Sequence, residues 1–233
     1  MGRLANVMSC YGYLYGVARK YDVRPILSDS MKAKLSTLFP GLTIPSFSDL
    51  NCDNGQKIFQ PILGIHDALN RLSQSDSFPI HILPTTLIGS TFRYAYLREL
   101  RHKDFKINAH IVQVVQEGLN RVKRVFLERQ ESISEVLFAG LHARRTDFEE
   151  KVVRERGGHP INETYFFRAM DEFRRRFGPY IVFVFASDDP KWVKDSFFHL
   201  PDVFFASDLD RKHINPAFFD FALLANCNHT IQR

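Results

Sequence analysis

The chain has 233 residues, and its 45% hydrophobic and 24% charged residues exclude wholesale disorder, collagen and a disulfide-stapled miniprotein. No apolar run approaches the ~20 residues of a membrane helix, and the first ten residues lack the pattern of a signal peptide. The net charge of +5 is compatible with an anionic ligand, but it is not the dense basic surface of a nucleic-acid-binding protein.

The N-terminal part of the chain is irregular. Met1 to Asn6 reads as a loop, and apolar residues at helical spacing from Val7 to Ala18 predict a helix. Residues 24–28 are apolar and bounded by turn formers, which predicts a strand. Between residues 30 and 100 we expect short helices and loops, with one strand near residues 80–83.

A long amphipathic helix is predicted at residues 109–130. Apolar residues recur on one side of it, from Ile111 to Phe126, while Arg121, Lys123 and Arg124 lie on the other side. We interpret the basic side as a solvated helix face.

From residue 136 onwards, strands and helices alternate. Apolar runs predict strands, and amphipathic stretches predict helices, in the order 136–142, 163–177, 181–186, 190–198, 203–206, 216–226 and 229–231. This alternation is typical of a parallel sheet with crossover helices. The prediction is an α/β protein with an N-terminal α/β domain at residues 1–135 and a C-terminal α/β domain at residues 136–233.

Ligands of open α/β sheets bind beyond the carboxyl ends of the strands. The segment His142-Ala143-Arg144-Arg145-Thr146-Asp147 ends the first strand of the C-terminal domain and carries cation-capable groups suited to phosphate. Spacing alone leaves two readings open, a phosphate site and an ion-paired loop in which Asp147 neutralises an arginine.

Asp188 and Asp189 follow the next strand and precede Pro190. An acidic or hydroxyl residue before proline is a typical helix start. Adjacent side chains diverge, and no third ligand accompanies them, so we interpret this pair as a helix start and not as a metal site. The three cysteines are far apart and form no CxxC pair, which favours small apolar residues over a metal or redox motif.

Three ordered segments resemble the galactoside alpha-(1,2)-fucosyltransferases, glycosyltransferase family 11. Gly2-Arg3-Leu4-Ala5-Asn6-Val7-Met8 is similar to the opening GRLGNQM motif of that family, and residues 142–147 are similar to its HxRRxD motif. The segment from Phe219 to Ile231, FDFALLANCNHTI, resembles the DFALLxxCNHTI segment. The chain departs from the first motif at Ala5 and Val7, where the family has glycine and glutamine.

The resemblance implies a GT-B-like arrangement of two Rossmann-like domains, the C-terminal one binding the donor nucleotide. It implies transfer of L-fucose from GDP-fucose to the 2-hydroxyl of a terminal galactose on a glycan, with inversion and without a metal or other cofactor. The expected partners are GDP-fucose and a galactose-terminated acceptor, with no nucleic acid. The alternative is a catalytically inactive relative that only binds GDP or glycan.

The resemblance also assigns site residues. Arg144 is the expected electrostatic stabiliser of the departing GDP, supported by His142 and Arg145, with Asp147 orienting a guanidinium. Asp220 is expected to accept hydrogen bonds from guanine. Gly2, Arg3 and Asn6 are expected to contact the donor from the N-terminal domain. Glu149 and Glu150 are both near, and the general base stays unassigned.

Family members have a further strand and a Golgi anchor before the first motif, and a phosphate-contacting loop after the last. The resemblance therefore implies a chain truncated at both ends and a Golgi-membrane, lumenal location. Asn162 and Asn228 each begin an N-glycosylation sequon. Asn162 is the better candidate because it precedes a helix in a polar loop, although a helix cap would also explain it.

Overall fold

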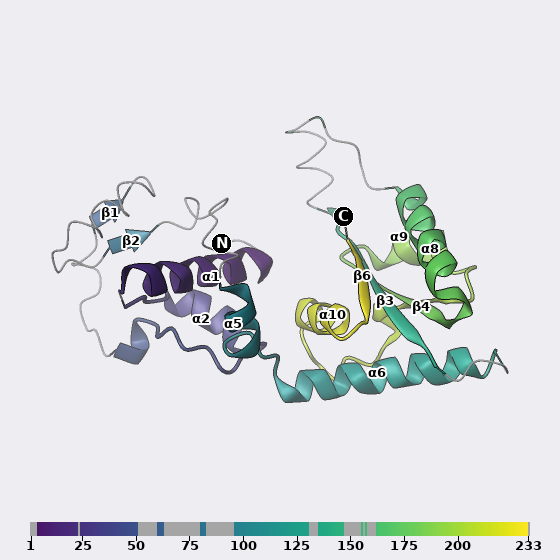
Figure 1. The fold of residues 1–233 in the computed structure, drawn as a ribbon, viewed down its shortest axis with the longest axis horizontal. Helices are drawn as coiled ribbons and strands as arrows, with labels where there is room; N and C mark the ends of the chain where they lie inside the picture. The colour runs from purple at the N-terminus through teal and green to yellow at the C-terminus, as the bar shows by residue number, and fades with distance from the viewer. Residues whose placement is uncertain are drawn as a thin grey trace. The chain divides into compact units, whose positions relative to one another are not determined.

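The computed structural model describes residues 4–22, 24–50, 60–62, 80–82, 96–130, 135–146, 155, 157 and 162–232. The chain forms two compact units, Met1–Asn108 and Ala109–Arg233, called here the N-terminal and the C-terminal unit (Figure 1).

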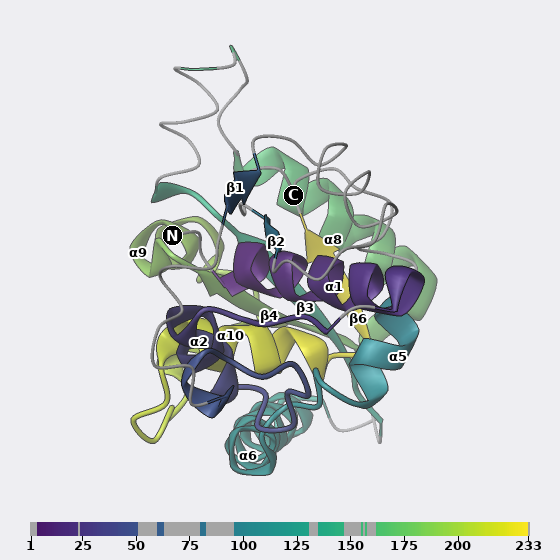
Figure 2. The ribbon, with the colours of Figure 1, turned by 90° about the vertical axis from the view of Figure 1, so that its left-hand side faces the viewer.

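The N-terminal unit is mostly helical where it is described. Its elements are α1 (Leu4–Tyr21), α2 (Asp29–Ser36), η1 (Ser48–Leu50), β1 (Gln60–Ile62), β2 (Ile80–Ile82) and α5 (Leu97–His102). Helix α1 packs beside α2, as Figure 2 shows. Its core includes the fully buried side chains of Tyr11, Leu35, Phe39 and Leu100. In the same unit, the buried carboxylate of Asp104 accepts hydrogen bonds from the Tyr11 hydroxyl and, at 2.7 Å, from the Thr43 backbone N–H.

Two predictions for this unit need correction. Helix α1 begins at Leu4, so Asn6 lies in its first turn and not in a loop. The strand predicted at residues 24–28 is only an isolated bridge between Leu27 and Ser46. Pro25 and Pro45 flank that bridge, and proline has no N–H with which to extend a ladder.

The predicted strand near residues 80–83 is confirmed as β2. Its parallel partner is β1, with Gln60 opposite Ile80. The sequence did not predict β1, because Pro61 at its centre reads as a turn former; proline is tolerated in short or edge strands.

The C-terminal unit follows the predicted order. Its elements are α6 (Ala109–Leu127), β3 (Leu137–Ala143), α8 (Glu163–Phe177), η4 (Gly178–Tyr180), β4 (Ile181–Ser187), α9 (Pro190–Phe197), β5 (Val203–Phe205), η5 (Ala206–Asp208), α10 (Pro216–Ala225) and β6 (His229–Gln232). Each predicted helix and strand from residue 109 onwards is confirmed to within a few residues. Gly178, with φ of 61°, ends α8 as expected of a glycine stop.

The four strands form one parallel sheet in the order β5-β4-β3-β6. The chain steps from β3 to β4 to β5 through α8 and α9, and α10 then returns it to β6 on the other side of β3. Right-handed crossovers place α8 and α9 on one face and α10 on the opposite face. Figure 1 shows this arrangement, with α6 beside α10. The predicted α/β class with a parallel sheet is thereby confirmed.

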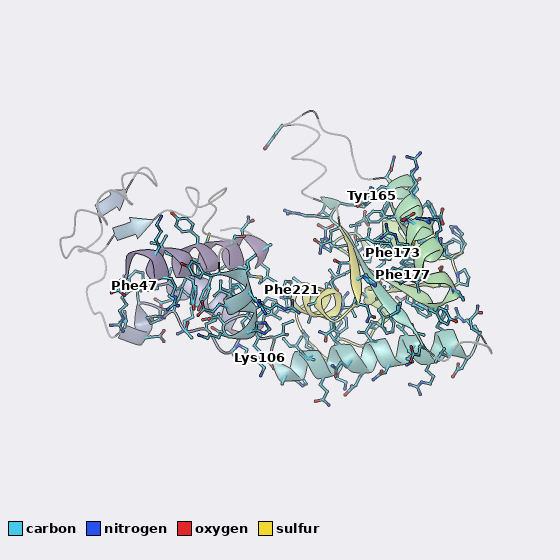
Figure 3. All side chains as sticks on the ribbon, viewed as in Figure 1. Phe47, Lys106, Tyr165, Phe173, Phe177 and Phe221 are labelled. Carbon is cyan, nitrogen blue, oxygen red and sulfur yellow. The ribbon has the colours of Figure 1, made fainter. Side chains whose placement is uncertain are left out.

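The core of this unit lies under α8 and α9. Alternate residues of β3 and β4 point into it, together with side chains from both helices: Ala139, Leu141, Ala143, Ile181, Phe183, Phe185, Phe166, Met170, Val193 and Phe197. Phe173 and Phe177 of α8, labelled in Figure 3, extend this layer, and the Phe177 ring lies 4.6 Å from that of His229. Phenylalanine side chains thus make up much of this layer.

On the opposite face, α10 lies directly on β3. A Cβ atom added to Gly140 would come within 2.7 Å of Leu224 Cδ2 and 3.1 Å of Cys227 Sγ. A larger residue at this point of β3 would displace the Leu224 side chain, so Gly140 allows α10 to approach the strand closely.

The division between units differs from the predicted domain boundary. It falls between Asn108 and Ala109, whereas the prediction placed it between residues 135 and 136. The difference is α6, which packs against α10 and whose Gly118 would bring a Cβ atom within 3.3 Å of Leu209 Cδ1. Helical periodicity predicts that α6 buries a stripe, but it does not say against which element.

Candidate active site

The topology of the C-terminal sheet selects one edge for ligand binding. The chain winds outward from β3 through β4 to β5, and then returns to β6 on the other side of β3. The crossover through α10 reverses the direction of winding, so β6 lies on the opposite side of β3 from β4, and the carboxyl ends of β3 and β6 form a topological switch point. Open α/β sheets bind ligands in the crevice outside such a point. Strand β3 ends there at Ala143, and Arg144 and Arg145 follow.

The loop after β3 is fastened by the loop after β4. Asp188 accepts hydrogen bonds from the Arg145 backbone N–H at 2.8 Å and from the Thr146 hydroxyl at 2.6 Å. Ser187 donates its hydroxyl to the Ala143 carbonyl at 2.8 Å and accepts from the Asp189 N–H at 3.0 Å. These bonds hold the start of the basic loop in one conformation.

The Arg145 side chain is enclosed by α9. Its Nε donates to Asp189 Oδ2 at 3.3 Å, and its guanidinium lies 4.0 Å above the Trp192 ring, with only 18% of the side chain exposed. A cation over an aromatic face and beside a carboxylate is stabilised by both. Arg145 therefore has fixed partners within the unit. Its neighbour Arg144 is half-buried at the switch point.

Asp188 and Asp189 do more than the sequence predicted. The predicted helix start is confirmed, with Asp189 as the N-cap that accepts from the Trp192 N–H at 3.1 Å. Both carboxylates also bind the loop after β3, and Trp192 packs on Arg145. Sequence reasoning missed this role, because Asp188 and Arg145 meet only when β3 and β4 pair. The predicted orienter, Asp147, lies outside the described residues.

Asp220 lies on α10 beside Arg211. The Arg211 Nη2 atom is 3.5 Å from Asp220 Oδ1, and the two side chains are 23% and 16% exposed. Burial raises the pKa of the Asp220 carboxyl to about 6, although the Arg211 guanidinium opposes that rise. Sequence reasoning did not identify Arg211; the only signal was a basic residue in the loop before α10.

His142 and Asp220 lie on the same face of the sheet. His142 follows Gly140 by two residues, so both point toward α10, and Leu224 packs over Gly140. Asp220 lies one turn before Leu224, about 6 Å along the axis of α10. His142 lies two residues after Gly140, about 6.6 Å along β3. Since crossover helices run antiparallel to their strands, Asp220 and His142 reach about the same level near the carboxyl end of β3.

The remaining predicted site residues are more scattered. Asn6 is exposed on α1 in the N-terminal unit. Gly2 and Arg3 lie outside the described residues. Asn162 is exposed and caps α8, accepting from the Tyr165 N–H at 3.4 Å, which confirms the helix-cap reading; its glycosylation stays a prediction. Asn228 Oδ1 accepts from the Phe138 N–H at 2.8 Å.

The described residues contain neither a candidate metal cluster nor a helix that could span a membrane. No cluster of three or more histidine, cysteine, aspartate or glutamate side chains there has the arrangement of a metal site. Within the same part of the chain, no helix combines the length and the apolar character needed to cross a bilayer.

Comparison with known proteins agrees with the motifs. Galactoside alpha-(1,2)-fucosyltransferase 1 of Saimiri sciureus is 30% identical over 232 residues, which cover 99% of this chain and 60% of that protein. The proteins of the same name from Plecturocebus brunneus and Alouatta caraya are also 30% identical, with the same coverage. The chain thus spans about three fifths of the length of these curated relatives. No solved structure matches it.

The family model of glycosyl transferase family 11 matches residues 73–232, which include the basic loop after β3 and the whole of α10. This match extends over more than half of the chain and confirms the resemblance seen in the motifs. The chain therefore belongs to glycosyl transferase family 11.

Proposed function

We propose that this chain belongs to an enzyme that transfers L-fucose from GDP-fucose to the 2-hydroxyl of a terminal galactose. Family membership and the printed names of the relatives support this proposal. The observation that carries it is the fastened basic loop at the switch point. Arg144 lies where a nucleotide diphosphate binds in such folds, and the bonds from Asp188 hold its loop in place before any ligand arrives.

The proposed reaction is a single displacement with inversion. The galactose 2-hydroxyl oxygen attacks C1 of fucose while the bond between C1 and the phosphate oxygen breaks, and the electron pair leaves with GDP. Arg144 stabilises the charge that develops on the diphosphate. The proton of the hydroxyl passes to a general base that is not assigned.

Asp220 forms the proposed guanine end of the donor site, and His142 is proposed to support Arg144 at the diphosphate. Asp220 and His142 both lie on the α10 side of β3, near the carboxyl end of the strand. In its ionised form Asp220 is an acceptor only, and guanine presents two N–H donors on one edge. The carboxylate therefore complements guanine in particular.

The proposed architecture is GT-B-like, with the C-terminal unit binding the donor and the N-terminal unit bringing Gly2, Arg3 and Asn6 to it. A Golgi-lumenal location is proposed with it, by family resemblance alone. The acceptor is proposed to be a galactose-terminated glycan.

Catalysis is proposed to need no metal. Asp188 and Asp189 support this, because both carboxylates already accept hydrogen bonds from Arg145, Thr146 and the start of α9. We expect GDP to bind equally well in the presence of EDTA, measured by isothermal titration calorimetry. Lost binding that manganese or magnesium restores would contradict the proposal.

A transfer assay tests the whole proposal. The chain is incubated with GDP-fucose and lactose, with GDP-mannose as the control donor, and products are identified by mass spectrometry and NMR. We expect fucose on the galactose 2-hydroxyl in the α configuration. GDP binding without any transfer would instead favour an inactive relative. Absence of GDP binding would contradict both the active fucosyltransferase and an inactive relative that binds GDP.

A further inference from the structure

The Arg211–Asp220 pair is the feature of the C-terminal unit that the family motifs do not account for. Arg211 belongs to the loop before α10, outside the three motifs, and its guanidinium lies 5.7 Å from the centre of the buried Phe219 ring. Its Nη2 reaches Asp220 Oδ1 at 3.5 Å. Among the described residues, no group accepts a hydrogen bond from the buried Arg211 Nε, and none donates to Asp220 Oδ2.

The loop that carries Arg211 has an uncommon backbone. Lys212 and His213 both have positive φ values, 45° and 66°, which non-glycine residues rarely adopt. The Lys212 N–H donates to Asp210 Oδ1 at 3.0 Å, and the Ile214 N–H donates to the Arg211 carbonyl at 2.9 Å. The Lys212 side chain also pairs with Glu117 on α6. Two consecutive residues with positive φ persist only when their surroundings hold them, and here they directly follow Arg211.

Arg211 is also next to the carboxyl ends of β4 and β5. It lines a small cavity of about 10 Å³ together with Ser187 at the end of β4 and Ser207 just after β5. Arg211 therefore lies at the edge of the sheet where the donor is proposed to bind.

Within the part of the chain that the structure describes, the charge that acts on Asp220 is that of Arg211. Arg211 faces it from the loop before α10, and His142 approaches its level from β3. On α6, the Glu117 carboxylate forms an ion pair with the Lys212 ammonium group. Burial alone favours the neutral carboxyl, and Arg211 is the cation that counteracts it. A protonated Asp220 would present an O–H donor instead of two acceptor oxygens.

We propose that Arg211 is a positioning residue that holds Asp220 as an oriented carboxylate, so that the donor site selects guanine over adenine. The inference rests on the proposed function. Arg211 binds one carboxylate oxygen and leaves the other open to the N–H edge of guanine. Adenine presents a ring acceptor at the corresponding position, so an ionised Asp220 repels it.

Calorimetric titration with GDP and with ADP between pH 5.5 and 8 tests this proposal. The variants are Arg211→Met, which keeps the length and removes the charge, and Arg211→Lys, which keeps the charge without the planar fork. Lys194→Gln is the matched control, because it removes a cation from an exposed pair with Asp208 that does not include Asp220. Circular dichroism melts establish that each variant is folded.

The wild type should prefer GDP at neutral pH and lose that preference as pH falls through about 6. Arg211→Met should reduce the GDP to ADP ratio at pH 7 by about tenfold or more, and should move the midpoint of the pH profile upward. Arg211→Lys should return the midpoint of the pH profile to its wild-type value but recover only part of the affinity for GDP. Lys194→Gln should match the wild type.

The outcomes separate the two ideas. A wild type that binds neither nucleotide, or binds both equally at every pH, overturns the proposed donor site. A wild type that prefers GDP, with an Arg211→Met variant of unchanged ratio and pH profile, overturns only the role of Arg211. Should Arg211→Met fail to fold, Arg211→Lys decides, because a profile and affinity identical to the wild type would mean that the guanidinium fork has no part.

Discussion

Arg144 and Arg145 are neighbours in the sequence, but we expect them to have different roles. Asp189 and Trp192 enclose the Arg145 guanidinium, so its positive charge is balanced by partners within the unit. Arg144 follows the last residue of β3 at the switch point. The family resemblance leads us to expect that Arg144 contacts the diphosphate, and the contacts of Arg145 lead us to expect that it holds the loop.

Replacing Arg144 with alanine should reduce kcat/KM by roughly a hundredfold to a thousandfold, or about 3 kcal/mol, as the loss of a preorganised donor to a developing anion does. Lysine should rescue poorly, because it lacks the two-point fork. The exposed Arg168 on α8 provides the control Arg168→Ala, which should leave kcat/KM unchanged. Full activity of Arg144→Ala would show that Arg144 does not stabilise the departing diphosphate.

Asp220 should make the free energy of unfolding depend on pH. Its folded pKa of about 6 exceeds its ordinary value of 3.8, so the folded state binds the proton more tightly. This contribution to stability is fully present below pH 3.8 and is lost as pH rises through about 6.

Between pH 4.5 and 7.5 the loss amounts to about 2 kcal/mol, and Asp220→Asn should abolish it. Urea unfolding of both proteins at several pH values measures the effect. The exposed Asp195 provides the control, since Asp195→Asn should keep the wild-type slope. Parallel pH profiles for wild type and Asp220→Asn would show that this carboxyl is not buried as described.

At the scale of elements, the junction between β3 and β4 sets the geometry of the site. Asp188 links them through the Arg145 N–H and the Thr146 hydroxyl. Asp188→Ala should cost about 1–3 kcal/mol of stability, because it leaves a backbone donor without its acceptor. It should also lower kcat more than it changes KM, since Arg144 loses its fixed loop.

Asp195→Ala is the matched control for Asp188, because Asp195 lies on α9, the helix that follows Asp188, in an exposed pair with Lys191. It should change stability by less than about 0.5 kcal/mol. Both quantities follow from denaturant unfolding and steady-state kinetics. Equal effects of the two substitutions would mean that the loop after β3 does not depend on Asp188.

At the scale of the whole molecule, the C-terminal unit has its own core and carries the proposed donor residues His142, Arg144, Arg211 and Asp220. A fragment of residues 109–233 should therefore melt cooperatively and bind GDP. A fragment of residues 136–233, cut at the boundary predicted from the sequence, lacks α6 and exposes the face of α10. It should aggregate or melt without a clear transition, as followed by calorimetry. Identical melts for both fragments would show that α6 is dispensable to this unit.

The sequence by itself determined much of the C-terminal unit. Helical periodicity, glycine and proline stops and apolar runs are local signals, and they placed α8 and β4 within a residue of the observed bounds. The position of the HARRTD segment at the end of a strand also followed, because ligand sites of parallel sheets lie at the carboxyl ends.

Only the tertiary structure decided which residues meet. Arg145 and Asp188 are brought together by the pairing of β3 with β4, and Gly140 meets Leu224 because α10 crosses back over β3. The sequence could not predict the partner of α6 or the pairing of Arg211 with Asp220. An amphipathic stripe or a lone arginine has the same sequence pattern whatever element it contacts. Periodicity reports the conformation of a segment, whereas burial and charge at a site depend on contacts between segments far apart in the chain.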